Sequence, residues 1–233
     1  MLEIKNLSYI AEDKEILRNI SLDFSKGINV ITGQNGSGKT TLAKIIMGIE
    51  KPTSGQIILD GQEITNLNLN EKANKGISLS FQQPATFKGL TVFDLLRLAN
   101  KNLTNTADAC KFLSKVGLCA RDYINREVNK NLSGGEQKRI EIASILAKGG
   151  EVLIFDEPEA GIDMWAFDEL ISLFEGLKDK IVIIISHQKR ILEIADKIFL
   201  FNKDKSLEVI TKETLNKQLE PKKCSLLRSQ NAN

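Results

Sequence analysis

The sequence predicts an α/β fold built around a parallel sheet, and three features lead to this prediction. A glycine-rich loop, residues 33–40, separates a short apolar strand-like run from a helical stretch. Two later apolar runs, 152–155 and 181–185, are too short for buried helices, and polar side chains follow each of them. Continuous apolar runs of this kind are typical of strands that are buried on both faces of a parallel sheet. Because ligands bind beyond the carboxyl ends of such strands, we expect the polar residues to form a site there.

Composition narrows the class of protein. The 233 residues, 42% of them hydrophobic, are enough to build one substantial core. No apolar run reaches the roughly 18 residues of a membrane span, and no leader-like segment precedes Leu2. Cys110, Cys119 and Cys224 lack a paired spacing, which argues against disulfides and a cysteine metal site. With 32 basic and 30 acidic residues the charge nearly balances, so we expect no nucleic-acid partner. From these observations together we expect a cytoplasmic protein without direct membrane insertion.

The pattern of the chain changes along its length. Residues 1–83 resemble short strands and turns around the glycine-rich loop, and residues 84–149 show helical periodicity. Residues 150–210 return to alternating strands and helices, and residues 211–233 form a tail too short for another domain. We therefore expect one continuous domain in which a helical region interrupts a strand-rich core.

The loop of residues 33–40 fits the phosphate-binding pattern and lies between the strand 28–32 and the helix 41–47. Its glycines let consecutive backbone N–H groups turn toward phosphate oxygens, and the helix adds its positive N-terminal end. Lys39 can reach the β- and γ-phosphates, and the Thr40 hydroxyl can ligate Mg²⁺. The alternative is a chance glycine-rich turn before a helix. The predicted nucleotide-binding residues are Gly33, Asn35, Gly36, Ser37, Gly38, Lys39, Thr40 and Thr41.

Two carboxylates follow the apolar run 152–155. A fully apolar strand tolerates carboxylates only at an exposed end where they bind a ligand, so we expect Asp156 and Glu157 to lie at such an end. We expect Asp156 to hold Mg²⁺ through water and Glu157 to act as the general base that deprotonates an attacking water. The alternative is an ordinary acidic turn before Pro158.

The only histidine of the chain follows the apolar run 181–185. That run delivers Ser186 and His187 to the carboxyl end of a strand, where a sensor of the γ-phosphate is needed. Taken alone, a single histidine after a buried strand is more often a structural residue. The nucleotide-handling motifs elsewhere in the chain favour the catalytic interpretation.

The segment Leu132–Glu136 combines a helix start with two glycines. Ser133 and Glu136 have the spacing of a capping box, which explains them as a structural helix cap. Two glycines in a first helical turn weaken the helix, and they are easier to explain if the backbone approaches a phosphate closely. An amphipathic helix with one apolar face follows, and this face carries Ile140, Ala143, Leu146 and Ala147.

Together these motifs resemble the ATP-binding cassette (ABC) ATPases, whose signature motif is similar to Leu132–Glu136. The resemblance implies a RecA-like core with an N-terminal antiparallel region, in which residues 1–83 and 150–210 bind nucleotide and residues 84–149 form a helical subdomain. Gln82 matches the family's glutamine loop, which implies a catalytic role. Asp163 lies in the loop that contacts the opposite subunit, and it is also a plausible helix N-cap. The implied metal ligands are Thr40, Gln82 and Asp156.

The resemblance also implies that the protein acts as a homodimer that ATP assembles. Ser133, Gly134 and Gly135 of one subunit would then contact the ATP of the other, while Lys39, Gln82 and His187 act within their own subunit. Hydrolysis of the ATP, which binds with Mg²⁺, would release the dimer and move an attached partner. Where many members of the family place an aromatic residue against adenine, this sequence has Ala11, with Tyr9 two residues away, so base selectivity stays open.

Three segments are similar to the SufC family of iron–sulfur cluster assembly ATPases. They are residues 1–7 together with 12–17, Phe81–Pro84 and Ser186–Leu192. This similarity implies a SufB- or SufD-like scaffold as the partner. The alternative is the ATP-binding subunit of a membrane transporter, in which the groove at Gln82–Leu90 would receive a permease helix and Phe87 is the candidate contact. A non-hydrolysing clamp is disfavoured because both Glu157 and His187 are present.

Overall fold

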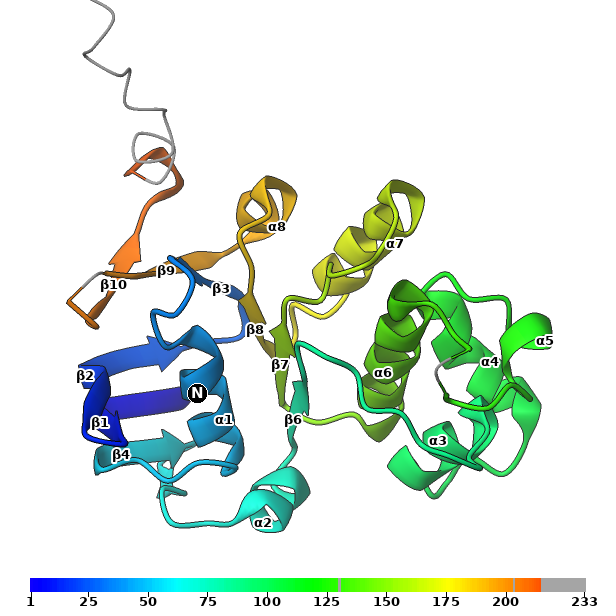
Figure 1. Ribbon diagram of the computed structural model, residues 1–233, viewed down its shortest axis with the longest axis horizontal. Coiled ribbons are helices and arrows are strands. Elements are labelled where there is room, and N and C mark those ends of the chain that lie inside the picture. The colour runs from blue at the N-terminus through cyan, green and yellow to red at the C-terminus, as the bar shows by residue number, and fades with distance from the viewer. Residues whose placement is uncertain (130, 203, 215–233) are drawn as a thin grey trace, which may run out of the picture.

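The computed structural model describes residues 1–129, 131–202 and 204–214, and it contains two sheets (Figure 1). The Lys222–Lys223 and Cys224 positions lie outside these residues. The strands are β1 (Leu2–Ala11), β2 (Lys14–Phe24), β3 (Gly27–Gly33), β4 (Ser54–Leu59), β5 (Gln62–Glu63), β6 (Ile77–Ser80), β7 (Val152–Asp156), β8 (Ile181–Ile185), β9 (Lys197–Phe201) and β10 (Leu207–Ile210). The helices are α1 (Lys39–Met47), α2 (Leu69–Asn74), α3 (Val92–Ala99), α4 (Thr106–Lys115), α5 (Ala120–Tyr123), α6 (Gly134–Lys148), α7 (Met164–Glu175) and α8 (Lys189–Ile194).

The larger sheet has the strand order β10-β9-β3-β8-β7-β6. All its pairs are parallel except the one between β9 and β10. Side chains of β3, β7 and β8 alternate between two hydrophobic cores on opposite faces, as Val30 and Ile31 do on β3. Burial on both faces explains why these strands are continuous apolar runs in the sequence. The predicted α/β fold with a parallel sheet is confirmed.

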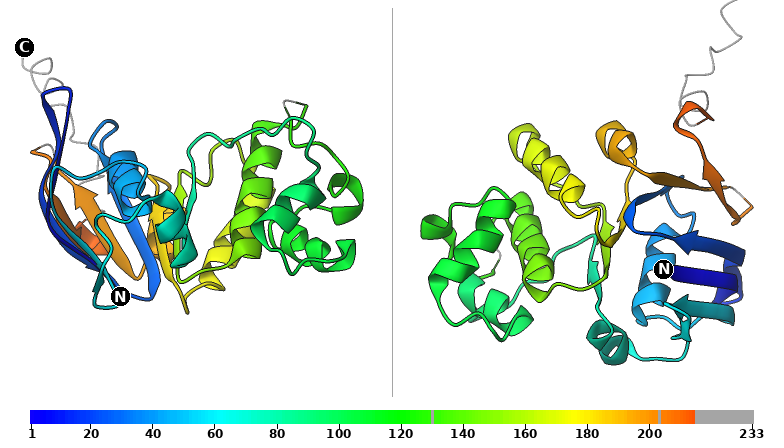
Figure 2. Two further views of the ribbon diagram at one scale, coloured as in Figure 1. Left: turned by 90° about the horizontal axis from the view of Figure 1, so that it is seen from below. Right: turned by 180° about the vertical axis from the view of Figure 1, so that it is seen from behind.

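The smaller sheet, β2-β1-β4-β5, is antiparallel and lies at the opposite end of the molecule from α3, α4 and α5 (Figures 1 and 2). Its inward side chains and those of α1 share one core with a face of the larger sheet. Phe24 of β2 meets Phe199 of β9 edge to face, with ring centroids 5.0 Å apart, so an aromatic pair joins the two sheets. This is the N-terminal antiparallel region that the family resemblance implies.

The helical region of the chain, green in Figure 1, packs against the other face of the larger sheet through α6. The helical periodicity of residues 84–149 corresponds to α3, α4, α5 and α6, and Gly117 follows α4 with a φ of +68°. The prediction of a single apolar face on α6 is too narrow, since Lys138, Ile142 and Ile145 are buried as well. The reason is that α6 lies between the sheet and α3 and α4, so several of its sides are covered.

Within the described part of the chain, no helix has both the length and the apolar character that crossing a membrane requires.

Lys72 on α2 is a buried cation that holds two helices together. Its side chain is fully buried, and its Nζ donates a hydrogen bond to the carbonyl of Ile45 near the end of α1, at 3.1 Å. The carbonyl end of a helix attracts positive charge. Desolvation nevertheless dominates, and burial lowers the pKa of Lys72 to about 8 from its ordinary value of 10.5. The charged form of Lys72 is thus less favourable in the folded chain than in the unfolded chain.

We expect Lys72 to make the stability of the protein rise between pH 8 and pH 10.5. In this window the unfolded chain still binds the Lys72 proton and the folded chain has lost it, so raising the pH favours folding. The contribution of this residue over the whole window is at most about 3 kcal/mol. Urea unfolding at a series of pH values, compared between wild type and Lys72→Met, measures it. Identical pH slopes for the two proteins would contradict the assignment.

Candidate functional site

The candidate site lies where the carboxyl ends of β3, β7 and β8 meet. The backbone N–H of Glu157 donates to the carbonyl of Ile185 at 3.0 Å, and that of Ser186 donates to the carbonyl of Ile31 at 3.2 Å. These bonds carry the strand pairing one residue beyond the ends of β7 and β8. The structure therefore brings the predicted acidic and histidine segments to one edge, beside the glycine-rich loop.

The loop between β3 and α1 exposes backbone N–H groups at the start of a helix. Gly36 and Gly38 have φ values of +74° and +110°, which favour glycine. A methyl group on Gly38 would also lie 2.7 Å from Cδ2 of Leu17. Gly38 is the N-cap of α1, and it makes no side-chain cap hydrogen bond to the first N–H groups of this helix. An uncapped helix start of this kind binds anions, and the buried Ser37 hydroxyl beside it has no hydrogen-bond partner.

Lys39 places its ammonium group on the loop. Its Nζ donates to the carbonyls of Gly33 and Gln34, at 2.8 and 2.9 Å. Burial lowers the pKa of Lys39, and the negative charges of Glu157 and Asp156 oppose that shift. The cation is therefore held beside the uncapped helix start, where phosphate oxygens would bring the negative charge that it lacks.

Thr40 and Asp156 form an oxygen-rich corner of the site. The Thr40 hydroxyl donates to Oδ2 of Asp156 at 2.7 Å, and the buried Oδ1 of Asp156 has no hydrogen-bond partner. Burial raises the pKa of Asp156, and the hydrogen bond from Thr40 opposes the shift. A hydroxyl and a carboxylate with a spare oxygen are ligands that Mg²⁺ prefers, so these residues fit the metal that the sequence implies.

Gln82 and Glu157, which are 75 positions apart in the sequence, lie in contact. Nε2 of Gln82 donates to Oε2 of Glu157 at 2.8 Å. The backbone of Glu157 is left-handed, with a φ of +45°, an unusual conformation that is common at functional sites. Both side chains line a cleft with a volume of about 480 Å³. The residues that line this cleft are Ile16, Asn35, Gly36, Ser37, Gly38, Lys39, Thr40, Thr41, Gln82 and Glu157.

His187 stands at the same sheet edge. Its Nδ1 lies 3.5 Å from the Thr32 hydroxyl. Partial desolvation lowers the pKa of His187, the charge of Lys39 lowers it further, and the charge of Glu157 opposes both. A lowered pKa keeps the imidazole neutral near pH 7, so that it can donate one hydrogen bond and accept another.

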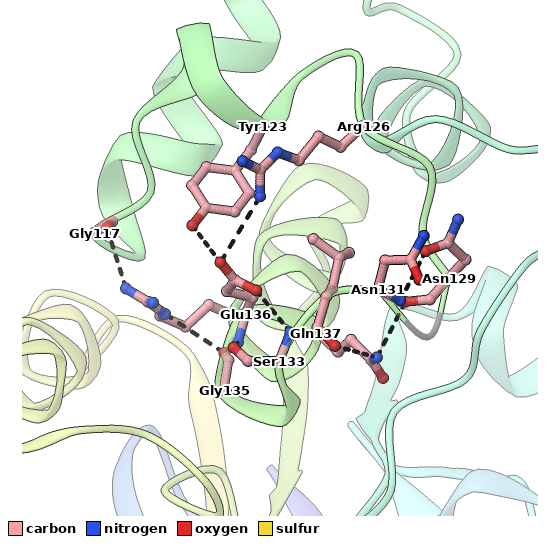
Figure 3. Close-up of polar contacts among 11 residues, drawn as sticks. Gly117, Tyr123, Arg126, Asn129, Asn131, Ser133, Gly135, Glu136 and Gln137 are labelled. Atoms are coloured by element: carbon pink, nitrogen blue, oxygen red, sulfur yellow. Dashed lines mark hydrogen bonds and ion pairs between the residues drawn. The ribbon is translucent and has the colours of Figure 1, made fainter.

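Figure 3 shows the signature segment at the start of α6. Ser133 and Glu136 form the predicted capping box: the Ser133 hydroxyl accepts from the N–H of Glu136 at 3.2 Å, and the Glu136 carboxylate accepts from the N–H of Ser133 at 2.6 Å. Tyr123 also donates to Glu136, and Arg126 lies 3.9 Å away. These contacts fix the helix start, so capping explains Ser133 and Glu136 within one chain.

The two glycines of this segment have different surroundings. A methyl group on Gly135 would lie 2.3 Å from the carbonyl oxygen of Gly161, so packing within the chain requires this glycine. A methyl group on Gly134 would meet no atom within 4 Å, and its position is exposed. Nothing in the described part of the chain therefore requires a glycine at position 134.

The structure separates the predicted site residues into two groups. Residues 35–41 of the loop, together with Gln82 and Glu157, line one cleft, and Asp156 is bonded to Thr40. The other predicted site residues, which do not line this cleft, are Gly33, His187, Ser133, Gly134 and Gly135. Asp163 caps α7 through the N–H groups of Trp165 and Ala166, as its alternative role predicts.

One residue that lines the cleft, Ile16, was not predicted to do so. The Tyr9 hydroxyl donates to Glu50 at 3.0 Å, so this tyrosine is engaged elsewhere, and Ile16 lines the cleft instead. Ile16 belongs to no motif. Its position follows from the fold of β2 beside the loop, which no local pattern encodes.

Comparison with known proteins places the chain in a family. The family described as ABC transporter matches residues 17–160. An uncharacterized ABC transporter ATP-binding protein of Methanocaldococcus jannaschii is 38% identical over 211 residues, which cover 86% of this chain and 84% of that protein. The probable ATP-dependent transporter ycf16 of Cyanophora paradoxa is 34% identical over 244 residues, with 95% and 92% covered.

Solved structures agree with this assignment. The dimeric structure of a bacterial ABC transporter cassette has a TM-score of 0.79 and 25% identity, and it covers 89% of this chain and 97% of that one. A second dimeric structure, of a post-hydrolysis state bound to ADP and phosphate, has a TM-score of 0.79 and 26% identity over the same shares. The chain belongs to the ABC transporter ATP-binding family. It is an ATP hydrolase of the ABC type, and the RecA-like fold that the motifs imply is confirmed.

The contrast between Gly134 and Gly135 gives a prediction. We expect Gly134→Ala to keep the thermal stability of the chain, because the added methyl meets open space, while ATP turnover falls at least about tenfold. We expect Gly135→Ala to lose stability as well, because the methyl collides with Gly161. Thermal unfolding and steady-state ATPase assays of both variants test this. Equal losses of stability would show that the two glycines have the same structural role.

Proposed function

We propose that this protein is an ATP-driven dimer whose hydrolysis cycle moves a partner held near Gln82. The observation that carries the proposal is the hydrogen bond between Gln82 and Glu157. It connects the carboxylate placed to activate water with a segment at the boundary between the sheet and the helical region. A partner that shifts this segment would change the position of the Glu157 carboxylate.

Within one subunit, the phosphate loop and Lys39 would bind the phosphates of ATP. Thr40, Gln82 and Asp156, which line one pocket, would hold Mg²⁺. The metal, when bound, neutralises charge on the phosphate oxygens. Glu157 would accept a proton from the attacking water, and Gln82 would keep its carboxylate oriented.

The second subunit would complete the site. Ser133, Gly134 and Gly135 lie outside the cleft, so they would reach a nucleotide only when it is bound to another copy of the chain. The exposed position of Gly134 and its lack of a packing role support this arrangement. The two solved cassettes with dimeric structures support it as well. His187, at the sheet edge beside Thr32, would sense the γ-phosphate within its own subunit.

Glu157→Gln tests the assignment of the general base. The amide keeps the size of the side chain but accepts no proton, so we expect turnover to fall at least about a hundredfold while ATP binding persists. The trapped ATP should then yield a stable dimer, measured by size exclusion with light scattering. His187→Ala should also lower turnover and spare affinity. The surface variant Glu193→Gln is the control and should behave as wild type. Rapid hydrolysis by Glu157→Gln would refute the assignment.

A SufB- or SufD-like scaffold is the partner that the sequence favours, which places the protein in iron–sulfur cluster assembly. The three segments that resemble the SufC family support this choice. A groove of about 330 Å³ that includes Gln82 is the candidate contact region. Leu79, Phe81 and Ala85 line it, and it reaches Thr40 and Asp156 of the nucleotide site. Phe81 lines this groove and is 41% exposed, and Phe87, in the nearby segment Gln82–Leu90, is a second exposed large apolar side chain, at 39%.

A membrane permease is the second candidate partner. Relatives named ABC transporter ATP-binding proteins support it, among them the spermidine/putrescine import ATP-binding protein PotA of Thermotoga maritima, which is 33% identical over 215 residues. That match covers 89% of this chain and 58% of PotA. Both partners would use the same groove, so the groove alone does not choose between them.

Phe87→Ala tests the contact with a partner. We expect this variant to keep its basal ATPase rate and to lose the stoichiometric companion when tagged protein is purified separately from cytosol and from solubilised membranes. Val209→Ala removes another exposed apolar side chain, on β10, which is 62% exposed, and should retain the companion. A β-helical companion from cytosol supports the scaffold, and a polytopic membrane protein overturns it. Loss of folding would show that Phe87 belongs to the core.

A further inference from the structure

Glu141, on α6, accepts hydrogen bonds from the end of β6 through both of its carboxylate oxygens. Its Oε2 accepts a hydrogen bond from the Ser80 hydroxyl at 2.7 Å, and its Oε1 accepts from the backbone N–H of Phe81 at 2.9 Å. The side chain of Glu141 is 15% exposed, and Ser80 is fully buried. Hydrogen bonds to an ionised carboxylate are about twice as strong as neutral ones, so this contact fixes the backbone of Phe81.

Lys138, one turn earlier on α6, holds the same backbone from the other side. Its Nζ donates to the carbonyl of Phe81, donates to the carbonyl of Asp156 at 3.0 Å, and lies 3.5 Å from Oε2 of Glu141. Both polar groups of the Phe81 backbone are therefore bonded to side chains of α6. The ring of Phe81 is 41% exposed, so packing of the ring contributes little to this placement.

Gln82 is the next residue after this anchor. Its backbone follows directly on that of Phe81, which Glu141 and Lys138 bind, and its side chain donates a hydrogen bond to Glu157. The chain of contacts thus runs from α6, through the backbone of Phe81, to the carboxylate in the cleft. Eight residues before Glu141, the same helix begins at Ser133.

We propose that Glu141 is a positioning residue that sets Gln82 against Glu157 and makes the placement of Gln82 follow that of α6. The inference rests on the proposed function, in which the start of α6 closes on the nucleotide of a second copy. Because α6 is one continuous helix, a displacement of Ser133 displaces Glu141 too. Closure of the dimer would thereby orient the water-activating carboxylate.

A merely structural role for Glu141 is the competing explanation, because its carboxylate also neutralises the buried Lys138. The two roles differ in one respect. If Glu141 acts through Gln82, removing Gln82 removes the effect of Glu141 on turnover. If Glu141 only supports the fold, the two losses multiply.

A double-mutant cycle with Glu141→Gln and Gln82→Ala separates these roles. We expect Glu141→Gln to lower kcat about tenfold with KM for ATP nearly unchanged, because it weakens charge-assisted bonds without touching the phosphates. In the Gln82→Ala background the same substitution should lower kcat by less than about twofold. Ser144→Ala is the matched control, since its hydroxyl bonds only the backbone carbonyl of Glu141, and it should keep wild-type kcat.

The outcomes divide clearly. Multiplicative losses of kcat would overturn the positioning role and leave the proposed function in place, and so would a wild-type kcat in Glu141→Gln. A wild-type kcat in Gln82→Ala would remove both the role of Gln82 in the proposed function and this inference. If thermal unfolding shows that Glu141→Gln does not fold, Ser80→Ala replaces it in the cycle. That variant removes one of the two hydrogen bonds, and we expect a loss of about threefold that again vanishes without Gln82.

Discussion

The buried ammonium group of Lys138 joins the helical region to the functional edge of the sheet, and the rest of the site depends on it. The side chain is 1% exposed, and three acceptors surround its Nζ: the carbonyls of Phe81 and Asp156 and the carboxylate of Glu141. A buried charge is costly unless such partners converge on it. Burial lowers the pKa of Lys138, and Glu141 and Asp156 oppose the shift. The ends of β6 and β7 and the placement of α6 therefore specify one another.

The cleft contains the opposite situation, in which charges are held near each other without full compensation. Burial lowers the pKa of Lys39 and raises the pKa of Asp156. The charge of each residue partly opposes the shift of the other. Ser37 and Asp156 keep buried oxygens without hydrogen-bond partners. Interiors rarely leave such groups unpaired unless a ligand supplies the partner. An anionic phosphate chain with a divalent cation supplies both missing kinds of partner.

The parts of this structure that could be predicted from the sequence are those whose physics is local. The left-handed glycines of the loop, the capping box at Ser133 and the apolar runs of β7 and β8 depend on residues a few positions apart, so a short pattern encodes them. Lys72, Ile16 and Lys138 could not be found in this way. Lys138 is 57 positions from its acceptor Phe81, and only the packing of α6 against the sheet brings the two together.

In this fold, local contacts within one loop would serve ATP binding, whereas contacts between distant parts of the chain would serve ATP turnover. Within one subunit, most of the residues that would surround the phosphates belong to one contiguous loop between β3 and α1 on the sheet core. The carboxylate that would activate water is oriented by Gln82, which is anchored by the helical region. A force on that region would therefore change the rate of hydrolysis more than the affinity for ATP. This is the property that a motor coupled to a partner needs, because the nucleotide stays bound until the partner permits the chemical step.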